Sequence, residues 1–131
     1  MTVAANIMRE AVPEIVLTLP RPPSANEIWA PAHDRSTGRL RMVTTYAYRQ
    51  WKQVAGLMVN TQTGGDTLPA SYCMSVHVPP GVDVDNLLKP TGDILQMCGV
   101  VKNDRFCESI VVTRDRSLDP DKIRVALWSL A

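Results

Sequence analysis

The sequence has 131 residues, of which 45% are hydrophobic and 21% are charged, and its formal net charge is +1. This composition is typical of one globular domain and excludes a disordered chain, so we expect a single domain over residues 1–131. No apolar run approaches the roughly 20 residues of a membrane helix, and we expect no membrane partner.

The first residues, 1–13, lack a long apolar core and include Arg9 and Glu10, so they do not predict a signal peptide. The cysteines are odd in number and lack the spacing of a disulfide framework or a zinc site. Free thiols are typical of a reducing compartment, and we therefore expect a cytoplasmic location.

Basic side chains are concentrated in residues 21–52, where six cations accompany two carboxylates and the net charge is +4. The remainder carries eight cations and eleven carboxylates, a net charge of −3. A basic surface beside an acidic pocket suits a metal-dependent enzyme that acts on a polyanion. The alternative is scattered surface charge in contact with water.

The first half of the chain begins with residues 1–13, whose weak periodicity predicts a flexible arm or an extra short strand. Residues 14–19 are apolar and β-branched and predict the first strand. A proline-rich loop follows at residues 20–24. Residues 32–41 are a polar, basic turn region, with Gly38 as the expected pivot of a small hairpin.

A helix is expected from Thr44 or Thr45, each a good N-cap, to residues 60–62. We interpret Trp29 and Trp51 as packing anchors rather than base-stacking residues. The apolar stripe of this helix would be formed by Ala47, Trp51, Val54 and Met58.

The second half predicts a strand at residues 70–78, a helix from near Asp85 to about Cys98, and strands at residues 107–114 and 122–129 joined as a hairpin. The order is β-loop-α-β-α-β-β. It predicts an α+β fold, a single two-layer domain with a mixed β-sheet and about two helices packed mainly on one face.

Carboxylates surround one cation in the acidic stretch, where Asp83, Asp85 and Asp93 accompany Lys89. In an extended chain the side chains of Asp83 and Asp85 would point to the same face. Hard oxygen donors without a His or Cys motif favour Mg²⁺, with Mn²⁺ as the second choice. Such an ion can activate water for phosphodiester hydrolysis, and Lys89 would add positive charge near the phosphate. The alternatives are a plain surface turn and a surface ion pair.

Asp104 follows in a turn after this helix. Pro90 is best tolerated in a first helical turn, so the helix and its carboxylates should begin near residues 85–87. A helix of about 13 residues spans roughly 20 Å. Asp104 therefore joins the site only if the chain from residue 100 runs back along the helix, and spacing alone leaves this open.

Three motifs occur in one order along nearly the whole chain. The first is Leu19-Pro-Arg-Pro-Pro-Ser-Ala-Asn26, and the second is Tyr48-Arg49-x-Trp51 in the expected first helix. The third comprises Asp83, Asp85, Asn86, Leu87, Lys89, Asp93, Leu95, Gly99, Asn103 and Asp104. Together they resemble the signatures of the RusA family of Holliday junction resolvases, found in bacteria and phages.

The resemblance implies a homodimeric, Mg²⁺-dependent endonuclease that makes paired nicks in four-way DNA junctions, in recombination and repair, without an organic cofactor. It implies Asp83, Asp85 and Asp104 as metal-binding catalytic carboxylates and Lys89 as the catalytic lysine, and leaves the role of Asp93 open. DNA binding is assigned to Arg21, Ser24, Asn26, Arg35, Arg39, Arg41 and Asn86.

One departure from the family is the short, arginine-poor turn before Asp83, which weakens the expected grip on junction DNA. The leading alternative is a catalytically weak junction-DNA-binding protein of phage or prophage origin. A third is an unrelated metal-binding domain with Asp-rich turns. Paired cuts need two sites related by a two-fold axis, and the first strand and the hairpin of residues 107–129 are the candidate dimer surfaces.

Overall fold

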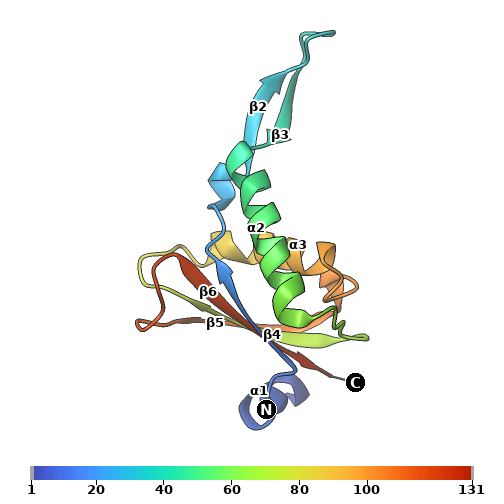
Figure 1. The fold of residues 1–131 in the computed structure, drawn as a ribbon, viewed down its shortest axis with the longest axis vertical. Coiled ribbons are helices and arrows are strands. Elements are labelled where there is room, and N and C mark those ends of the chain that lie inside the picture. The colour runs from blue at the N-terminus through green and yellow to red at the C-terminus, as the bar shows by residue number, and fades with distance from the viewer. Residues whose placement is uncertain (1, 131) are drawn as a thin grey trace.

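The computed structural model describes residues 2–130, apart from the side chain of Ala25. In chain order the elements are α1 (Val3–Glu10), β1 (Ile15–Pro20), the 3-10 turn η1 (Ala25–Glu27), β2 (Trp29–His33), β3 (Leu40–Thr44), α2 (Tyr46–Thr63), β4 (Tyr72–Val78), α3 (Asp85–Met97), the 3-10 turn η2 (Asp104–Phe106), β5 (Cys107–Arg114) and β6 (Lys122–Ser129). They form a mixed four-stranded sheet, three helices and a separate two-stranded hairpin (Figure 1). The predicted α+β class is confirmed.

The sheet has the strand order β1-β6-β4-β5. Strand β6 pairs antiparallel with both β1 and β4, and β5 pairs parallel with β4. The expected hairpin of residues 107–114 and 122–129 is therefore wrong, because β4 lies between these strands. Helix α3 is a crossover that carries the chain back to the starting end of β4, so β5 runs parallel to it.

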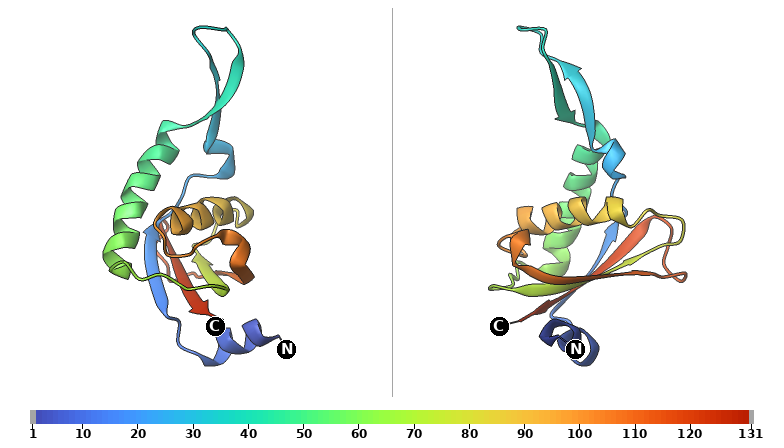
Figure 2. Two further views of the ribbon diagram at one scale, coloured as in Figure 1. Left: turned by 90° about the vertical axis from the view of Figure 1, so that its right-hand side faces the viewer. Right: turned by 180° about the vertical axis from the view of Figure 1, so that it is seen from behind.

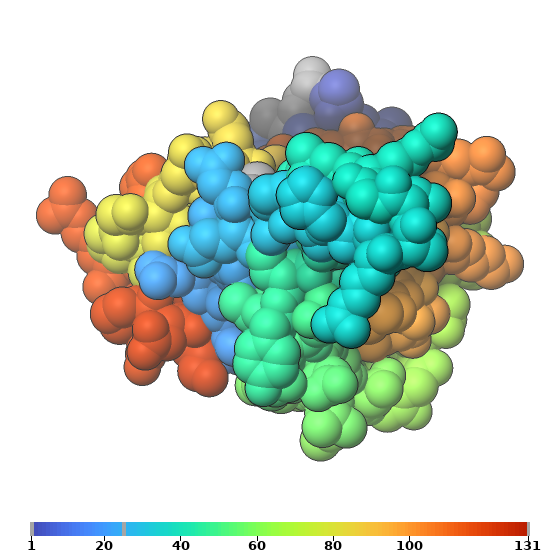
Figure 3. Space-filling view, turned by 90° about the horizontal axis from the view of Figure 1, so that it is seen from above, coloured from blue at the N-terminus to red at the C-terminus, as the bar shows by residue number. Residues whose placement is uncertain are grey.

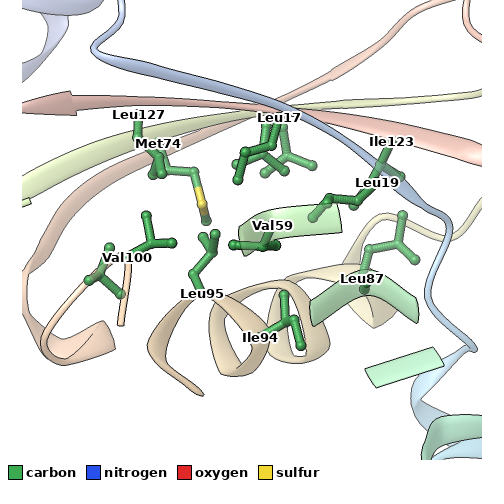
Figure 4. Packing of buried hydrophobic residues seen from close by; sticks show 14 of the residues in the cluster. Leu17, Leu19, Val59, Met74, Leu87, Ile94, Leu95, Val100, Ile123 and Leu127 are labelled. Carbon is green, nitrogen blue, oxygen red and sulfur yellow. The ribbon is translucent and has the colours of Figure 1, made fainter. Parts of the chain in front are cut away.

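The main core lies between the sheet and helices α2 and α3, which cover one face (Figure 2). Figure 4 shows Leu17 and Leu19 of β1 meeting Leu95 of α3 and Val59 of α2 in this layer. All four side chains are fully buried. Because α3 is held through Leu95 and its neighbours, the core fixes the position of the acidic stretch over the sheet.

Helix α2 begins as expected, since the Thr45 hydroxyl accepts a hydrogen bond from the Tyr48 N–H at 3.2 Å. Trp51 is buried as expected, and its indole N–H donates to the Pro20 carbonyl at 2.9 Å. This bond helps to set the rotation of the helix. The rest of the predicted stripe is shifted: Val54 is 49% exposed, and the buried residues are Tyr48, Trp51, Ala55, Gly56, Val59 and Thr63.

Residues 3–10 form a helix rather than the expected flexible arm or strand; Met1 lies outside the described residues. The Thr2 hydroxyl accepts a hydrogen bond from the Ala5 N–H at 3.1 Å and caps α1. Ala4 is buried against Cys73 and Trp128 on the sheet face opposite to α2 and α3. This second, smaller core holds the N-terminal segment against the sheet.

Strands β2 and β3, with the turn between them, form a hairpin that we call the arm (residues 29–44). It confirms the predicted hairpin, with Gly38 at φ +70° in its turn. The arm projects beyond the body of the molecule, and it stands in front of the body when viewed from above (Figures 1 and 3). Trp29 is 54% exposed on the arm, so its expected role as a packing anchor is wrong. Within residues 2–130, no other element packs on the arm so as to bury the Trp29 indole.

None of the helices formed by residues 2–130 combines the length and hydropathy that a membrane span requires.

Candidate functional site

The acidic stretch lies where β4 ends and α3 begins. Gly81, at φ +83°, turns the chain after the strand. The Asp83 carboxylate then accepts hydrogen bonds from the Asp85 N–H and the Asn86 side-chain amide, each at 3.2 Å. Asp85 becomes the first residue of α3, as the sequence predicts. A carboxylate in this position is stabilised by the positive end of the helix dipole.

Asp85, Lys89 and Asp104 line one open cavity of about 360 Å³, which we call the acidic cavity. One wall is a face of α3, and the rest comes from the start of β4 and from residues 104–110. Its complete lining is Tyr72, Met74, Asp85, Leu88, Lys89, Gly92, Asp104, Cys107 and Ile110. The structure thus brings together three of the four residues predicted to be catalytic.

Asp104 reaches this cavity because the chain reverses after α3. Gly99, at φ +74°, follows the helix, and the Asp104 N–H donates to the Gln96 side-chain oxygen at 3.1 Å. The segment from residue 100 therefore does return to the helix. It returns beside Gln96, however, which lies eleven residues along α3 from Asp85, or roughly 16 Å. The two carboxylates line the same cavity, and Asp104 also contributes to the raised pKa of Lys89, about one helical turn from Asp85.

Lys89 is held by Asp93, not by Asp85. Its ammonium group lies 2.9 Å from one Asp93 oxygen, and the Tyr48 hydroxyl donates to the other at 3.5 Å. The hydrogen bond and charge of Asp93 raise the pKa of Lys89, with a smaller contribution from Asp104. Burial, followed by Asp93, raises the pKa of Tyr48 to about 12. Lys89 is therefore a cation at neutral pH, and Asp93, whose role the sequence left open, positions it.

The fourth predicted catalytic residue, Asp83, faces a different cavity of about 200 Å³, which we call the proline-loop cavity. Three of the side chains assigned to DNA binding line it with Asp83: Arg21, Ser24 and Asn86. The other side chains assigned to DNA binding lie elsewhere. Asn26 is exposed in η1, outside this lining, and Arg35, Arg39 and Arg41 lie on the arm.

The donors of the acidic cavity fit Mg²⁺ in chemistry. The carboxylates of Asp85 and Asp104 belong to exposed residues, and neither forms an ion pair among the described residues. Mg²⁺ is usually bound through one or two carboxylates and keeps several waters. Within residues 2–130, no three His, Cys, Asp or Glu side chains lie close enough to hold an ion together. The predicted triad of Asp83, Asp85 and Asp104 is therefore not assembled as one cluster there.

Sequence reasoning did not find the residues that support this cavity. Gln96 fixes the Asp104 backbone, and Tyr48 fixes Asp93; Tyr72 and Cys107 line the inner side. Burial raises the pKa of Tyr72 and of Cys107, so both are protonated at neutral pH, which makes the thiol unreactive. These contacts join segments that are distant in sequence, so no local signal pointed to them.

No protein-family model matches this chain, and a search of curated proteins finds none that matches it.

Proposed function

We propose that this protein is a Mg²⁺-dependent endonuclease that resolves four-way DNA junctions in recombination and repair, as a homodimer in the cytoplasm. One observation carries the proposal. Asp85, Lys89 and Asp104, which are separated in sequence, line the same open cavity. Carboxylates that can hold a metal ion, with a cation beside them, suit phosphodiester hydrolysis. The three sequence motifs described above add the resemblance to RusA resolvases.

In this proposal Asp85 and Asp104 would hold the ion. Asp83 would join them only by turning away from the proline-loop cavity, which it lines here. When bound, the ion supplies an activated water and neutralises charge on the phosphate. Lys89 provides a second positive charge for the phosphate oxygens, and Asp93 limits the positions that its flexible side chain can take. The hydrogen bond from Asp104 to Gln96 keeps that carboxylate at the cavity.

DNA would contact two regions of the protein. Arg21, Ser24 and Asn86 lie at the proline-loop cavity, next to the start of α3, where they suit the phosphate nearest the site. Arg35, Arg39 and Arg41 lie on the arm, away from the cavity, where they suit a more distant duplex arm of the junction. Phosphate contacts of this kind supply affinity and orientation rather than sequence preference.

The second candidate function is a junction-binding protein that cleaves weakly. It is favoured by the position of Asp83, whose two oxygens are occupied at the start of α3 and which lines the proline-loop cavity instead. A site with two of its three carboxylates would retain the basic surfaces and lose most of the chemistry.

The deciding experiment incubates the purified protein with a synthetic four-way junction and, separately, with a linear duplex of the same sequence, with and without Mg²⁺. The proposal expects nicks in two opposed strands of the junction only when Mg²⁺ is present, mapped on denaturing gels. Binding to the junction without nicks would favour the second candidate. A protein that neither binds nor nicks the junction would contradict both candidate functions.

A further inference from the structure

The acidic cavity has an uncharged side that a metal ion does not use. Its volume is about 360 Å³, at the lower end of the range for cavities that enclose small organic molecules. Asp85, Lys89 and Asp104 supply its charged groups. The rest of its lining is uncharged and comes from β4, α3 and residues 107–110 at the edge strand β5: Tyr72, Met74, Leu88, Gly92, Cys107 and Ile110. An ion and a phosphate would occupy the charged side, which leaves the uncharged side for another group.

The uncharged side is mostly apolar. Tyr72 and Met74 form its floor, and each is at most 2% exposed. Ile110 is 43% exposed on β5, and Leu88 is half-buried on α3. Burial raises the pKa of the Cys107 thiol, so that side chain is neutral at pH 7. Apolar and aromatic walls of this kind receive flat groups such as an unstacked nucleobase.

Gly92 stands in the wall of the cavity, in the interior of α3. It follows Asp85 by seven residues and Lys89 by three, so the three share one face of the helix. Glycine is among the least favourable residues in a helix interior, and its presence there calls for a reason. One usual reason, a positive φ, does not apply to Gly92.

Close packing within the chain does not explain this glycine either. A Cβ on Gly92 would meet no atom of residues 2–130 within 4 Å, apart from its own turn of helix. The glycine of α2 differs, because a Cβ on Gly56 would lie 3.7 Å from the Cys98 Sγ. The fold therefore leaves the space in front of Gly92 open. The remaining role of such a glycine is the close approach of a bound molecule.

The two sides of the cavity match the two parts of a nucleotide. A phosphate carries the charge that an ion on Asp85 and Asp104, together with the Lys89 ammonium, would neutralise. The base, one sugar away, has apolar faces. Strands change partners at the branch point of a junction, so a base there loses less stacking than one inside a duplex. A base joined to the scissile phosphate would therefore reach the uncharged side in the same binding event.

We propose that the acidic cavity receives one unstacked base of the cut strand, next to the scissile phosphate, and that Gly92 makes room for it. Leu88 and Ile110 contact the base, and the missing side chain at Gly92 lets it lie against α3. This inference rests on the proposed function and names the part of the substrate that the uncharged side recognises. It adds a second reason for preferring branched to linear DNA, namely the lower cost of unstacking a base at the branch point.

The test is a cycle between a protein variant and a DNA variant. Gly92→Leu fills the open space, and a junction with an abasic nucleotide beside the mapped cut, on the 5′ or the 3′ side, lacks the base. Single-turnover cleavage with Mg²⁺ is measured for both proteins on both junctions. On the complete junction Gly92→Leu should be at least about tenfold slower than the wild type. On one of the abasic junctions the two proteins should differ by less than about twofold, because no base is left to exclude.

Two controls separate this effect from a change in the fold. Met97→Phe adds bulk at a 59% exposed position of α3 outside the cavity and should cleave both junctions like the wild type. Gly92→Leu and Gly92→Ala should both raise the melting temperature, because each replaces a helical glycine by a better helix former. Slower cleavage by a more stable protein excludes unfolding as the cause. If Gly92→Leu does not fold, Gly92→Ala gives the same cycle with a smaller effect.

The outcomes distinguish this inference from the proposed function. Equal slowing of Gly92→Leu on the complete and abasic junctions would overturn the base site and leave the endonuclease proposal intact, as would unchanged cleavage by this variant. If the wild type binds the junction without cutting it, dissociation constants replace rates and the abasic nucleotide is placed at the branch point. A loss of affinity confined to the complete junction would then support the base site, and equal affinities would overturn it. A wild type that neither binds nor cuts the junction would overturn both.

Discussion

The acidic cavity and the arm are built in opposite ways. The cavity combines residues from α3, β4 and the segment 104–110, and a buried core that includes Leu95 fixes their arrangement. The arm is held by local pairing between adjacent strands and by a few hydrogen bonds at its base. Its large apolar side chains remain exposed.

The difference separates two demands on one small chain. Groups that carry out chemistry must be held within a fraction of an ångström, which a packed core can do. Groups that contact a partner need reach, and a projecting hairpin provides it with few residues. Substitutions in the two regions should therefore have different effects, and the following measurements test this.

The largest effect is expected at Asp85. Asp85→Asn should reduce junction cleavage at least about 100-fold, because it removes a predicted metal ligand. Junction affinity should be unchanged or higher, since the substitution removes one negative charge near phosphate. Single-turnover cleavage and a binding titration would measure the two quantities. Asp66→Asn, an exposed carboxylate outside both cavities, is the control, and full cleavage by Asp85→Asn would contradict the site assignment.

The next effect concerns the free energy of unfolding. Leu95→Ala removes a fully buried side chain from the layer beneath α3 and should cost about 2–5 kcal/mol. Val43→Ala, on strand β3 of the arm, should cost only about 0.5 kcal/mol. Urea denaturation would compare them. Similar losses would contradict the difference in packing between the two regions.

A smaller effect is expected from the arginines of the arm. Arg39→Ala and Arg41→Ala should weaken junction binding and flatten its dependence on salt, by about 0.9 in the logarithmic slope for each phosphate that is no longer neutralised. Affinities measured over a salt series would give the slope. Arg114→Ala, at the exposed end of β5, serves as a control of equal charge. An unchanged slope would exclude these two side chains from phosphate binding.

The smallest effect is expected at the Lys89–Asp93 pair. The pKa of Lys89 is raised in the folded protein, so the pair stabilises the fold below the ordinary lysine pKa and ceases to do so as the pH rises through the raised value. Asp93→Asn should lower stability by a few tenths of a kcal/mol at neutral pH, because the pair is largely exposed. Melting temperatures of the two proteins should converge at strongly alkaline pH; a constant difference would assign the effect to Tyr48 instead.

Local signals in the sequence were sufficient for the elements around the site. Helix α3 begins at Asp85 as predicted, but Pro90 is its sixth residue and lies inside the helix, not in the expected first turn. The Thr45 cap is also as predicted, because capping residues act over a few positions. The same holds for the hairpin at Gly38, where a turn residue with positive φ is required.

Relations between distant segments could not be read in the same way. A turn between two strand-like segments predicts a hairpin whether or not a third strand is inserted, and here β4 separates β5 from β6. The rotation of α2 depends partly on a bond from Trp51 to a carbonyl 31 residues away. The position of Asp104 depends on Gln96, which no spacing rule selects.

The order of the strands also bears on how the chain folds. Residues 15–20 of β1 pair only with residues 122–127 in the sheet, more than 100 positions later. During synthesis, β1 therefore cannot pair in the sheet until almost the whole described chain has been made. Closing such long loops before any pairing is gained slows folding. A chain that ended before Lys122 would leave facing edges on β1 and β4 unpaired, and such edges are prone to aggregation.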